Sequence, residues 1–114
     1  AVRRVIENRF DDPAAADWVI VGDLNDYTET DGAADEGHGL GPLLADGFAV
    51  DAVKRIADAK DRWTHFYPEG RVYRQLDYVL LSPALARKNP DAVPTILRQG
   101  LPYRAERYQG PRYP

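Results

Sequence analysis

The 114-residue sequence contains no cysteine and no methionine. Without cysteine the chain can form no disulfide, no cysteine-ligated zinc site, no iron–sulfur cluster and no thiol nucleophile, and this absence fits either side of a membrane. No apolar run approaches the roughly 18–20 residues that a membrane-spanning helix needs, and the start of the chain lacks the pattern of a signal peptide. Because it starts at Ala1 without methionine, we expect the chain to be a processed product or a fragment of something longer.

The overall composition is ordinary, but the charges are unevenly distributed. Hydrophobic residues make up 44% and charged residues 29%, as in most globular proteins, and a chain of this length buries roughly 60–70% of its unfolded surface. The net charge is −3, yet residues 1–61 hold 14 acidic and 6 basic side chains, whereas residues 62–114 hold 4 and 9. This asymmetry fits a polyanionic partner or a metal, or simply two faces that attract each other; charge alone favours the last interpretation.

The pattern of apolar residues predicts a single α/β domain over 1–114. Apolar residues at helical spacing predict a helix over 2–10, and the β-branched run at 18–21 is typical of a strand buried on both faces. Further elements are expected at 43–48 and 50–59 (helices), 63–66 and 71–73 (a hairpin), 76–81 (an apolar strand), after Ser82 as N-cap (a helix) and at 93–97 (a strand). We interpret 26–41 as a long acidic loop and 99–114 as a loop-like tail.

Polar residues follow the first predicted strand, in the segment Gly22-Asp23-Leu24-Asn25-Asp26. Ligands bind at the carboxyl ends of buried strands in α/β architectures, and Asp23 and Asn25 carry the hard oxygen ligands that suit Mg²⁺, Mn²⁺ or Ca²⁺. The same spacing is also typical of a turn in which both side chains bond only to local backbone. The pattern alone favours neither interpretation.

A second acidic residue, Asp77, interrupts the apolar strand at 76–81. A carboxylate buried in such a strand costs several kcal/mol unless it is paired or bound to a metal. We therefore expect Asp77 to have a partner, with Arg74 and His65 as candidates within the chain and a catalytic histidine as the alternative.

Three segments, taken together and in this order, are more specific than any one of them. They are Val19-Ile20-Val21-Gly22-Asp23-Leu24-Asn25-Asp26, Trp63-Thr64-His65 and Arg74-Gln75-Leu76-Asp77-Tyr78-Val79-Leu80-Leu81-Ser82-Pro83. This combination resembles the endonuclease/exonuclease/phosphatase (DNase I-like) superfamily over about residues 1–98. The resemblance implies a four-layer α/β/β/α sandwich, of which the chain would form the carboxy-terminal half.

The resemblance also implies a function and a role for each matching residue. It implies hydrolysis of a phosphodiester or phosphomonoester, most simply by a nuclease, with Mg²⁺ (or Mn²⁺, with Ca²⁺ as a further option) as cofactor and nucleic acid as a possible partner. Asp23 would position the attacking water or the metal, and Asn25 would bind near the phosphate oxygens. Asp77 would orient a catalytic histidine. Apart from the resemblance, Arg71 and Arg74 lie near this segment and could contact the substrate phosphate, although arginines in a hairpin are usually just exposed. Thr64 matches a recurrent position without an assigned role.

The chain also departs from the family pattern. The family's metal-binding glutamate and one of its histidines precede the Gly-Asp-x-Asn strand, and its terminal Ser-Asp-His strand follows the region matched here. His38 and His65 occupy neither place. We therefore expect about half an active site, no turnover by these 114 residues alone, and the missing portions of the domain as partners. The alternative is a truncated or degenerate copy that acts as a non-catalytic binding or structural module.

Overall fold

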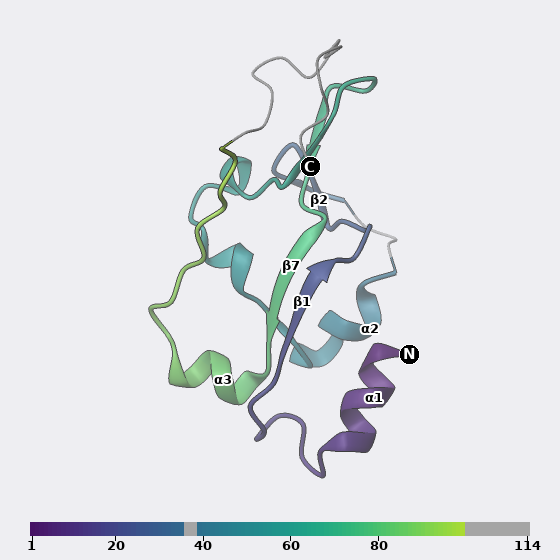
Figure 1. Ribbon diagram of the computed structural model, residues 1–114, viewed down its shortest axis with the longest axis vertical. Helices are drawn as coiled ribbons and strands as arrows, with labels where there is room; N and C mark the ends of the chain where they lie inside the picture. The colour runs from purple at the N-terminus through teal and green to yellow at the C-terminus, as the bar shows by residue number, and fades with distance from the viewer. Residues whose placement is uncertain (36–38, 100–114) are drawn as a thin grey trace.

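Two antiparallel sheets and three short α-helices form the part of the chain that the computed structural model describes, residues 1–35 and 39–99 (Figure 1). The α-helices are α1 (Val2–Arg9), α2 (Gly41–Leu44) and α3 (Pro83–Lys88), and the short 3₁₀ turns are η1 (Ala45–Gly47), η2 (Ala52–Arg55) and η3 (Ala59–Asp61). The strands are β1 (Val19–Asp23), β2 (Glu29–Thr30), β3 (Ala33–Ala34), β4 (Val50–Asp51), β5 (His65–Tyr67), β6 (Val72–Arg74) and β7 (Asp77–Leu81). The predicted mixed α/β class is confirmed.

The three-stranded sheet has the order β1-β7-β4 and is antiparallel throughout. β1 and β7 pair over their full lengths, from Val19 opposite Leu81 to Asp23 opposite Asp77. The pairing continues one step further, since the Leu24 N–H donates to the Leu76 carbonyl at 2.8 Å. The two apolar runs that the sequence singled out are therefore partners in one sheet.

The second sheet has the order β3-β2-β6-β5 and contains the predicted hairpin, which is confirmed as β5 and β6. Only one residue pair, Thr30 opposite Arg74, joins β2 to β6. The hairpin projects beyond the upper end of β7 (Figure 1), which agrees with the elongated dimensions of 51 × 29 × 29 Å. β2 and β3 lie within the stretch predicted as a loop, so that prediction is wrong for residues 29–34.

The hydrophobic core lies between one face of the three-stranded sheet and the helices α1 and α2. Tyr78 and Leu80 of β7 contribute to it together with Ile6 of α1. Trp18 closes the core beside β1: its indole N–H donates to the Pro13 carbonyl at 2.8 Å, and its ring centroid lies 5.3 Å from that of Phe48. The predicted helix at the start of the chain is confirmed, and its one buried residue is Ile6.

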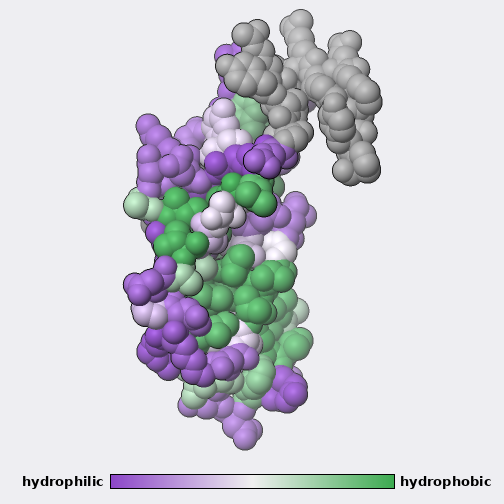
Figure 2. Space-filling view, turned by 60° about the vertical axis from the view of Figure 1, so that its left-hand side comes forward, coloured by the Kyte–Doolittle hydropathy of each residue, from purple (hydrophilic) through white to green (hydrophobic). Residues whose placement is uncertain are grey.

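The opposite face of this sheet is open to solvent. Val19 is 49% exposed and Val21 is 66% exposed, and Figure 2 shows hydrophobic surface over the middle of one side of the molecule. The prediction that both faces of this strand are buried is therefore wrong. An apolar run fixes which residues alternate along a strand, but only neighbouring elements decide whether a face is covered.

Local sequence signals predicted the last helix correctly, but two other predicted elements do not form as predicted. The Ser82 hydroxyl accepts a hydrogen bond from the Leu85 N–H, with Pro83 as the first helical residue, as predicted for α3. The predicted helix at 50–59 is instead β4 followed by η2, because Asp51 pairs with β7 and its side chain caps the 3₁₀ turn. The predicted strand at 93–97 has no regular secondary structure.

The remaining predictions concern the helix at 43–48 and the tail. α2 begins earlier, at Gly41, and ends at Leu44, where η1 continues the chain through Asp46 and Gly47 with positive φ. The predicted tail lies outside the described residues except for Gln99. No helix in the described ranges has the length and apolar character needed to cross a membrane.

Candidate functional site

Two of the predicted site residues, Asp23 and Asp77, lie directly opposite each other where β1 ends and β7 begins. Cross-strand partners point to the same face of a sheet, with Cβ atoms about 4.5–5.5 Å apart. Both side chains are exposed. The expectation that Asp77 is buried is therefore wrong: along β7 it alternates with Tyr78, so Asp77 lies on the open face and Tyr78 on the core face.

Asn25 lies next to this pair in a left-handed backbone conformation, with φ of 51°. Its backbone N–H donates to Oδ1 of Asp23 at 2.8 Å, which is the local turn that the sequence left as one alternative. This turn leaves Oδ2 of Asp23 and the amide group of Asn25 available on the exposed surface. The turn therefore holds the Asp23 carboxylate in one orientation, and it leaves Oδ2 of Asp23 free to bind a ligand.

Arg74 and His65 are held away from the carboxylate of Asp77. The Arg74 guanidinium lies over the rings of Tyr27 and Tyr67, at 4.0 and 5.2 Å, and its Nε donates to the Thr30 hydroxyl. The His65 ring packs edge-on against Tyr67 at 4.4 Å. In residues 1–35 and 39–99 no side chain hydrogen-bonds to the Asp77 carboxylate or forms an ion pair with it. Neither partner that we expected within the chain is therefore observed.

Thr64, for which we predicted no role, fixes the backbone of Asp77. Its hydroxyl accepts hydrogen bonds from the N–H groups of Leu76 at 2.9 Å and Asp77 at 3.1 Å. Its own N–H donates to the Arg74 carbonyl. A single side chain therefore holds the junction between β6 and β7, where the chain passes from one sheet to the other. The only sequence signal was the position of Thr64 in the Trp-Thr-His segment.

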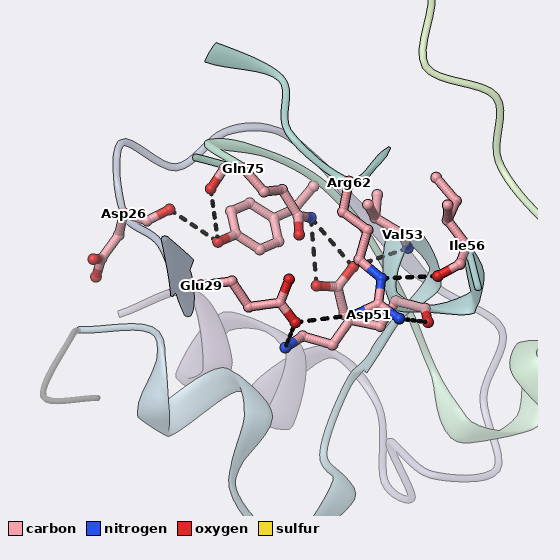
Figure 3. A network of polar contacts seen from close by, with 9 residues as sticks. Asp26, Glu29, Asp51, Val53, Ile56, Arg62 and Gln75 are labelled. Atoms are coloured by element: carbon pink, nitrogen blue, oxygen red, sulfur yellow. Dashed lines mark hydrogen bonds and ion pairs between the residues drawn. The ribbon is translucent and has the colours of Figure 1, made fainter. Parts of the chain in front are cut away.

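The buried carboxylate of this sheet is Asp51, which the sequence analysis did not single out. Asp51 is 8% exposed and accepts from the Val53 N–H at 3.0 Å. Burial raises its pKa above the ordinary value of 3.8, while the Val53 bond and the Gln75 amide partly oppose that shift. Gln75 links this residue to the candidate site. Its Nε2 lies 3.4 Å from both oxygens of Asp51 (Figure 3) and also donates to the Asp77 carbonyl at 3.1 Å.

The Tyr78 hydroxyl connects the start of the acidic loop to the same junction. It donates to the backbone carbonyls of Asp26 and Gln75, at 2.9 and 3.1 Å. Burial raises the pKa of the phenol, with Asp51 and Asp26 adding to the shift, so Tyr78 stays protonated and remains a donor. The backbone on both sides of the Asp23–Asp77 pair is thus held by buried hydrogen bonds.

The exposed groups at this site carry oxygen atoms of the kind that bind Mg²⁺ in proteins. Within the described ranges no group of three or more His, Cys, Asp or Glu side chains could enclose a metal. Mg²⁺, however, is commonly bound by one or two carboxylates together with waters and substrate phosphate. Asp23 and Asp77 supply two carboxylates, and Asn25 supplies an amide oxygen beside them. His38 lies outside the described residues.

Comparison of the sequence with protein-family models and with curated proteins, and of the structure with solved structures, found no match. The structure by itself shows an arrangement of side chains and neither a family nor an activity. The fold brings Asp23, Asn25 and Asp77 together on one exposed surface, supported from behind by Thr64, Gln75 and Tyr78, and it keeps Arg74 on the second sheet.

Proposed function

We propose that this chain is part of a metal-dependent phosphoesterase, most simply a nuclease of the DNase I-like type, that is active when the complete domain is present. The observation that supports the proposal best is the register of β1 and β7, which puts Asp23 opposite Asp77 with Asn25 beside them. Two like charges directly opposite each other destabilise a sheet. Such a pair, exposed and without a cation among the described residues, suits a site whose positive charge comes from a ligand.

The open face of the three-stranded sheet supports the finer proposal of a sandwich. β1 exposes Val19 and Val21 on this face, although both are large apolar residues. Two sheets that pack face to face bury such residues between them. We place the remaining portion of the domain on this face, so that the Asp23–Asp77 pair lies at the edge of the interface between the two sheets.

In the proposed reaction each residue has a distinct task. The Asp23 carboxylate, fixed by the Asn25 N–H, orients the attacking water and takes its proton as the water oxygen bonds to phosphorus. The ester P–O bond breaks, and the leaving oxygen takes a proton from solvent. The Asn25 side-chain amide donates to a phosphate oxygen. Asp77 accepts a hydrogen bond from an imidazole on the remaining portion of the domain and holds its tautomer. When bound, a divalent ion held by Asp23 and Asn25 offsets charge on the phosphoryl oxygens.

Cation binding can be tested on the 114-residue chain itself. In an NMR titration with Mn²⁺, the amide signals of Asp23, Asn25 and Asp77 should broaden before all others. The Asp23→Asn variant should abolish this selective broadening, whereas Asp91→Asn, which changes an exposed carboxylate elsewhere, should leave it unchanged. Uniform broadening across the acidic residues would exclude a specific cation site.

Activity requires a chain that also contains the missing portions of the domain. We expect it to hydrolyse bis-p-nitrophenyl phosphate and plasmid DNA with Mg²⁺ or Mn²⁺. Asp23→Ala and Asp77→Asn should each lower the rate by about 10²–10³-fold, as does the loss of one group that stabilises developing charge, and Asp91→Asn should have no effect. If full activity survived both substitutions, this assignment would be wrong. A complete domain without any activity would instead favour the non-catalytic binding module.

A further inference from the structure

A cavity of about 310 Å³ lies between β2, η3 and β6, and its lining includes neither Asp23 nor Asp77. Trp63 and Tyr73 give it aromatic walls, while Glu29, Lys60 and Gln75 are among its polar lining residues. Its volume is within the range of sites that bind small molecules. Two of its nine lining residues are aromatic and five are charged or polar, so it offers both ring contacts and hydrogen-bonding groups. The proposed catalytic residues are not part of it.

The aromatic walls of the cavity are held in place by their neighbours. The rings of Trp63 and Tyr73 meet edge to face with centroids 4.9 Å apart. The Arg98 guanidinium lies over the Trp63 ring at 4.1 Å and donates to the Trp63 carbonyl, and the Phe66 ring lies 4.5 Å from that of Tyr73. The cavity is therefore preformed, which lowers the entropic cost of binding a flat ligand.

A buried hydrogen-bond acceptor in the cavity lining has no partner. Gln75 is 3% exposed, and its Oε1 is without a hydrogen bond in the described part of the chain. Its Nε2 is already used, since it donates to the Asp77 carbonyl. Leaving such an acceptor unpaired costs roughly 1–3 kcal/mol. Rotation of the Gln75 side chain toward the cavity that it lines would let a ligand N–H supply the missing donor.

The charges around the cavity favour an uncharged ring inside and an anionic group outside. Oε1 of Glu29 is ion-paired with Lys54 at 3.1 Å and with Arg62 at 3.0 Å (Figure 3). The carboxylate of Asp31, another lining residue, accepts a hydrogen bond from the Tyr73 N–H at 2.9 Å. Arg62 also donates to two backbone carbonyls. Lys60, by contrast, is exposed and forms no ion pair with any described residue, so its ammonium group can meet a phosphate.

From these features we infer that the cavity binds a nucleobase: a flat heteroaromatic ring with N–H donors at its edge and a phosphate attached. Bases bind proteins through aromatic contact and hydrogen bonds to the base edge. The inference rests on the proposed function, because the cavity is tied to the candidate site through backbone bonds. Thr64, which follows Trp63, accepts from the Asp77 N–H, and Gln75 donates to the Asp77 carbonyl. The base would belong to a free nucleotide or to a single-stranded nucleic acid.

The binding test uses the 114-residue chain, without metal, and the two indole N–H signals in its NMR spectrum. Trp63 lines the cavity, whereas the Trp18 indole N–H is bonded to Pro13 in the core and serves as an internal reference. Adenosine 5′-monophosphate and a short single-stranded DNA should shift the Trp63 signal and leave the Trp18 signal in place. Ribose 5-phosphate and an abasic strand of equal length should not. The stronger of the two base-containing probes identifies the source of the base.

Two alanines provide a matched pair of variants. Ala59 lines the cavity, and Ala57 is an exposed residue outside its lining. Ala59→Leu should fill the cavity and weaken binding of the base-containing probe by about tenfold or more, in line with the loss of a base–aromatic contact. Ala57→Leu should change the affinity less than twofold, which is a smaller change than the loss of one base–aromatic contact would cause. Equal affinity of the two variants, or equal binding of ribose 5-phosphate and adenosine 5′-monophosphate by the wild-type chain, would overturn the inference.

The same probes separate this inference from the proposed function. Asp77→Asn should lower the rate of hydrolysis in the complete domain by about 10²–10³-fold and leave base binding intact. Hydrolysis without any base-specific shift of Trp63 would refute the cavity as a base site and leave the phosphoesterase standing. Base binding in a complete domain that never hydrolyses a phosphate ester would refute the enzyme and leave the cavity as a nucleotide-binding site.

Discussion

The two faces of the three-stranded sheet are built from alternate residues of the same strands, yet they differ in every physical respect. On the core face, Leu80 is 0% exposed and Asp51 has its carboxylate bonded to the Val53 N–H. On the open face, Val21 is exposed, and Asp23 faces Asp77 without a cation among the described residues. Carboxylates of the same sheet therefore serve different purposes: the buried one stabilises the fold, and the exposed pair is available for chemistry.

Truncating one apolar residue on each face should give the largest difference in stability between the two faces. Leu80→Ala removes a fully buried side chain and should lower the free energy of unfolding by about 2–5 kcal/mol. Val21→Ala should cost less than about 1 kcal/mol, because that side chain is largely exposed. Urea denaturation of both variants measures the difference. Similar losses would mean that the open face is covered in solution.

Removing an aspartate should likewise lower the free energy of unfolding more on the core face than on the open face. Asp51→Ala leaves the buried Val53 N–H without its acceptor and should lower the free energy of unfolding by about 1–3 kcal/mol. Asp77→Ala removes an exposed side chain and should stay within about 0.5 kcal/mol of the wild type. If the Asp77 variant proved the less stable of the two, the comparison between the faces would be reversed.

Stability should also depend on pH through Asp51. Because burial raises its pKa, the folded state binds the Asp51 proton more tightly than the unfolded state does. The contribution of Asp51 is therefore fully present below its unfolded pKa and is lost as the pH rises through the folded pKa. Asp51→Asn keeps an acceptor for Val53 but cannot ionise, so its stability relative to the wild type should rise with pH. Urea denaturation series between about pH 4 and pH 7 test this, and a constant difference would contradict it.

The smallest expected effect concerns the exposed pair. Asp23→Asn should raise the free energy of unfolding by about 0.2–1 kcal/mol at low salt, since it removes the like charge opposite Asp77. Salt should reduce the gain because the pair is exposed. Asp77→Asn should give a similar gain, and the double variant should gain no more than either one. Additive gains would show that the two carboxylates do not interact.

Elements with a local cause could be predicted from the sequence. The Ser82-Pro83 start of α3 is an example, because a hydroxyl cap and a proline act within one helical turn. The helix predicted at 50–59 is wrong because a long-range contact decides the structure of its start. Its apolar spacing suits a helix, but Val50 and Asp51 pair with β7, and this long-range pairing overrides local propensity.

The sequence pointed to the residues of the candidate site, but it did not predict which of their side chains are buried and which are exposed. The Gly-Asp-x-Asn and Leu-Asp-Tyr segments located Asp23, Asn25 and Asp77, and the register brings these residues together. The expected burial of Asp77 was wrong, and the buried carboxylate proved to be Asp51. An acidic residue in an apolar strand shows that one face differs from the other, but the sequence does not show which face is covered.

By itself, the sequence determined the chemistry that this chain can carry and the two-residue alternation of β1 and β7. It contains carboxylates, an amide and aromatic rings, and no thiol. Only the tertiary structure decided that Asp23 meets Asp77, that Thr64 and Gln75 fix the Asp77 backbone, and that Trp63 and Tyr73 enclose a cavity. The physical reason is that alternation follows from backbone geometry within one strand, whereas register, burial and cavities depend on contacts between segments far apart in the chain.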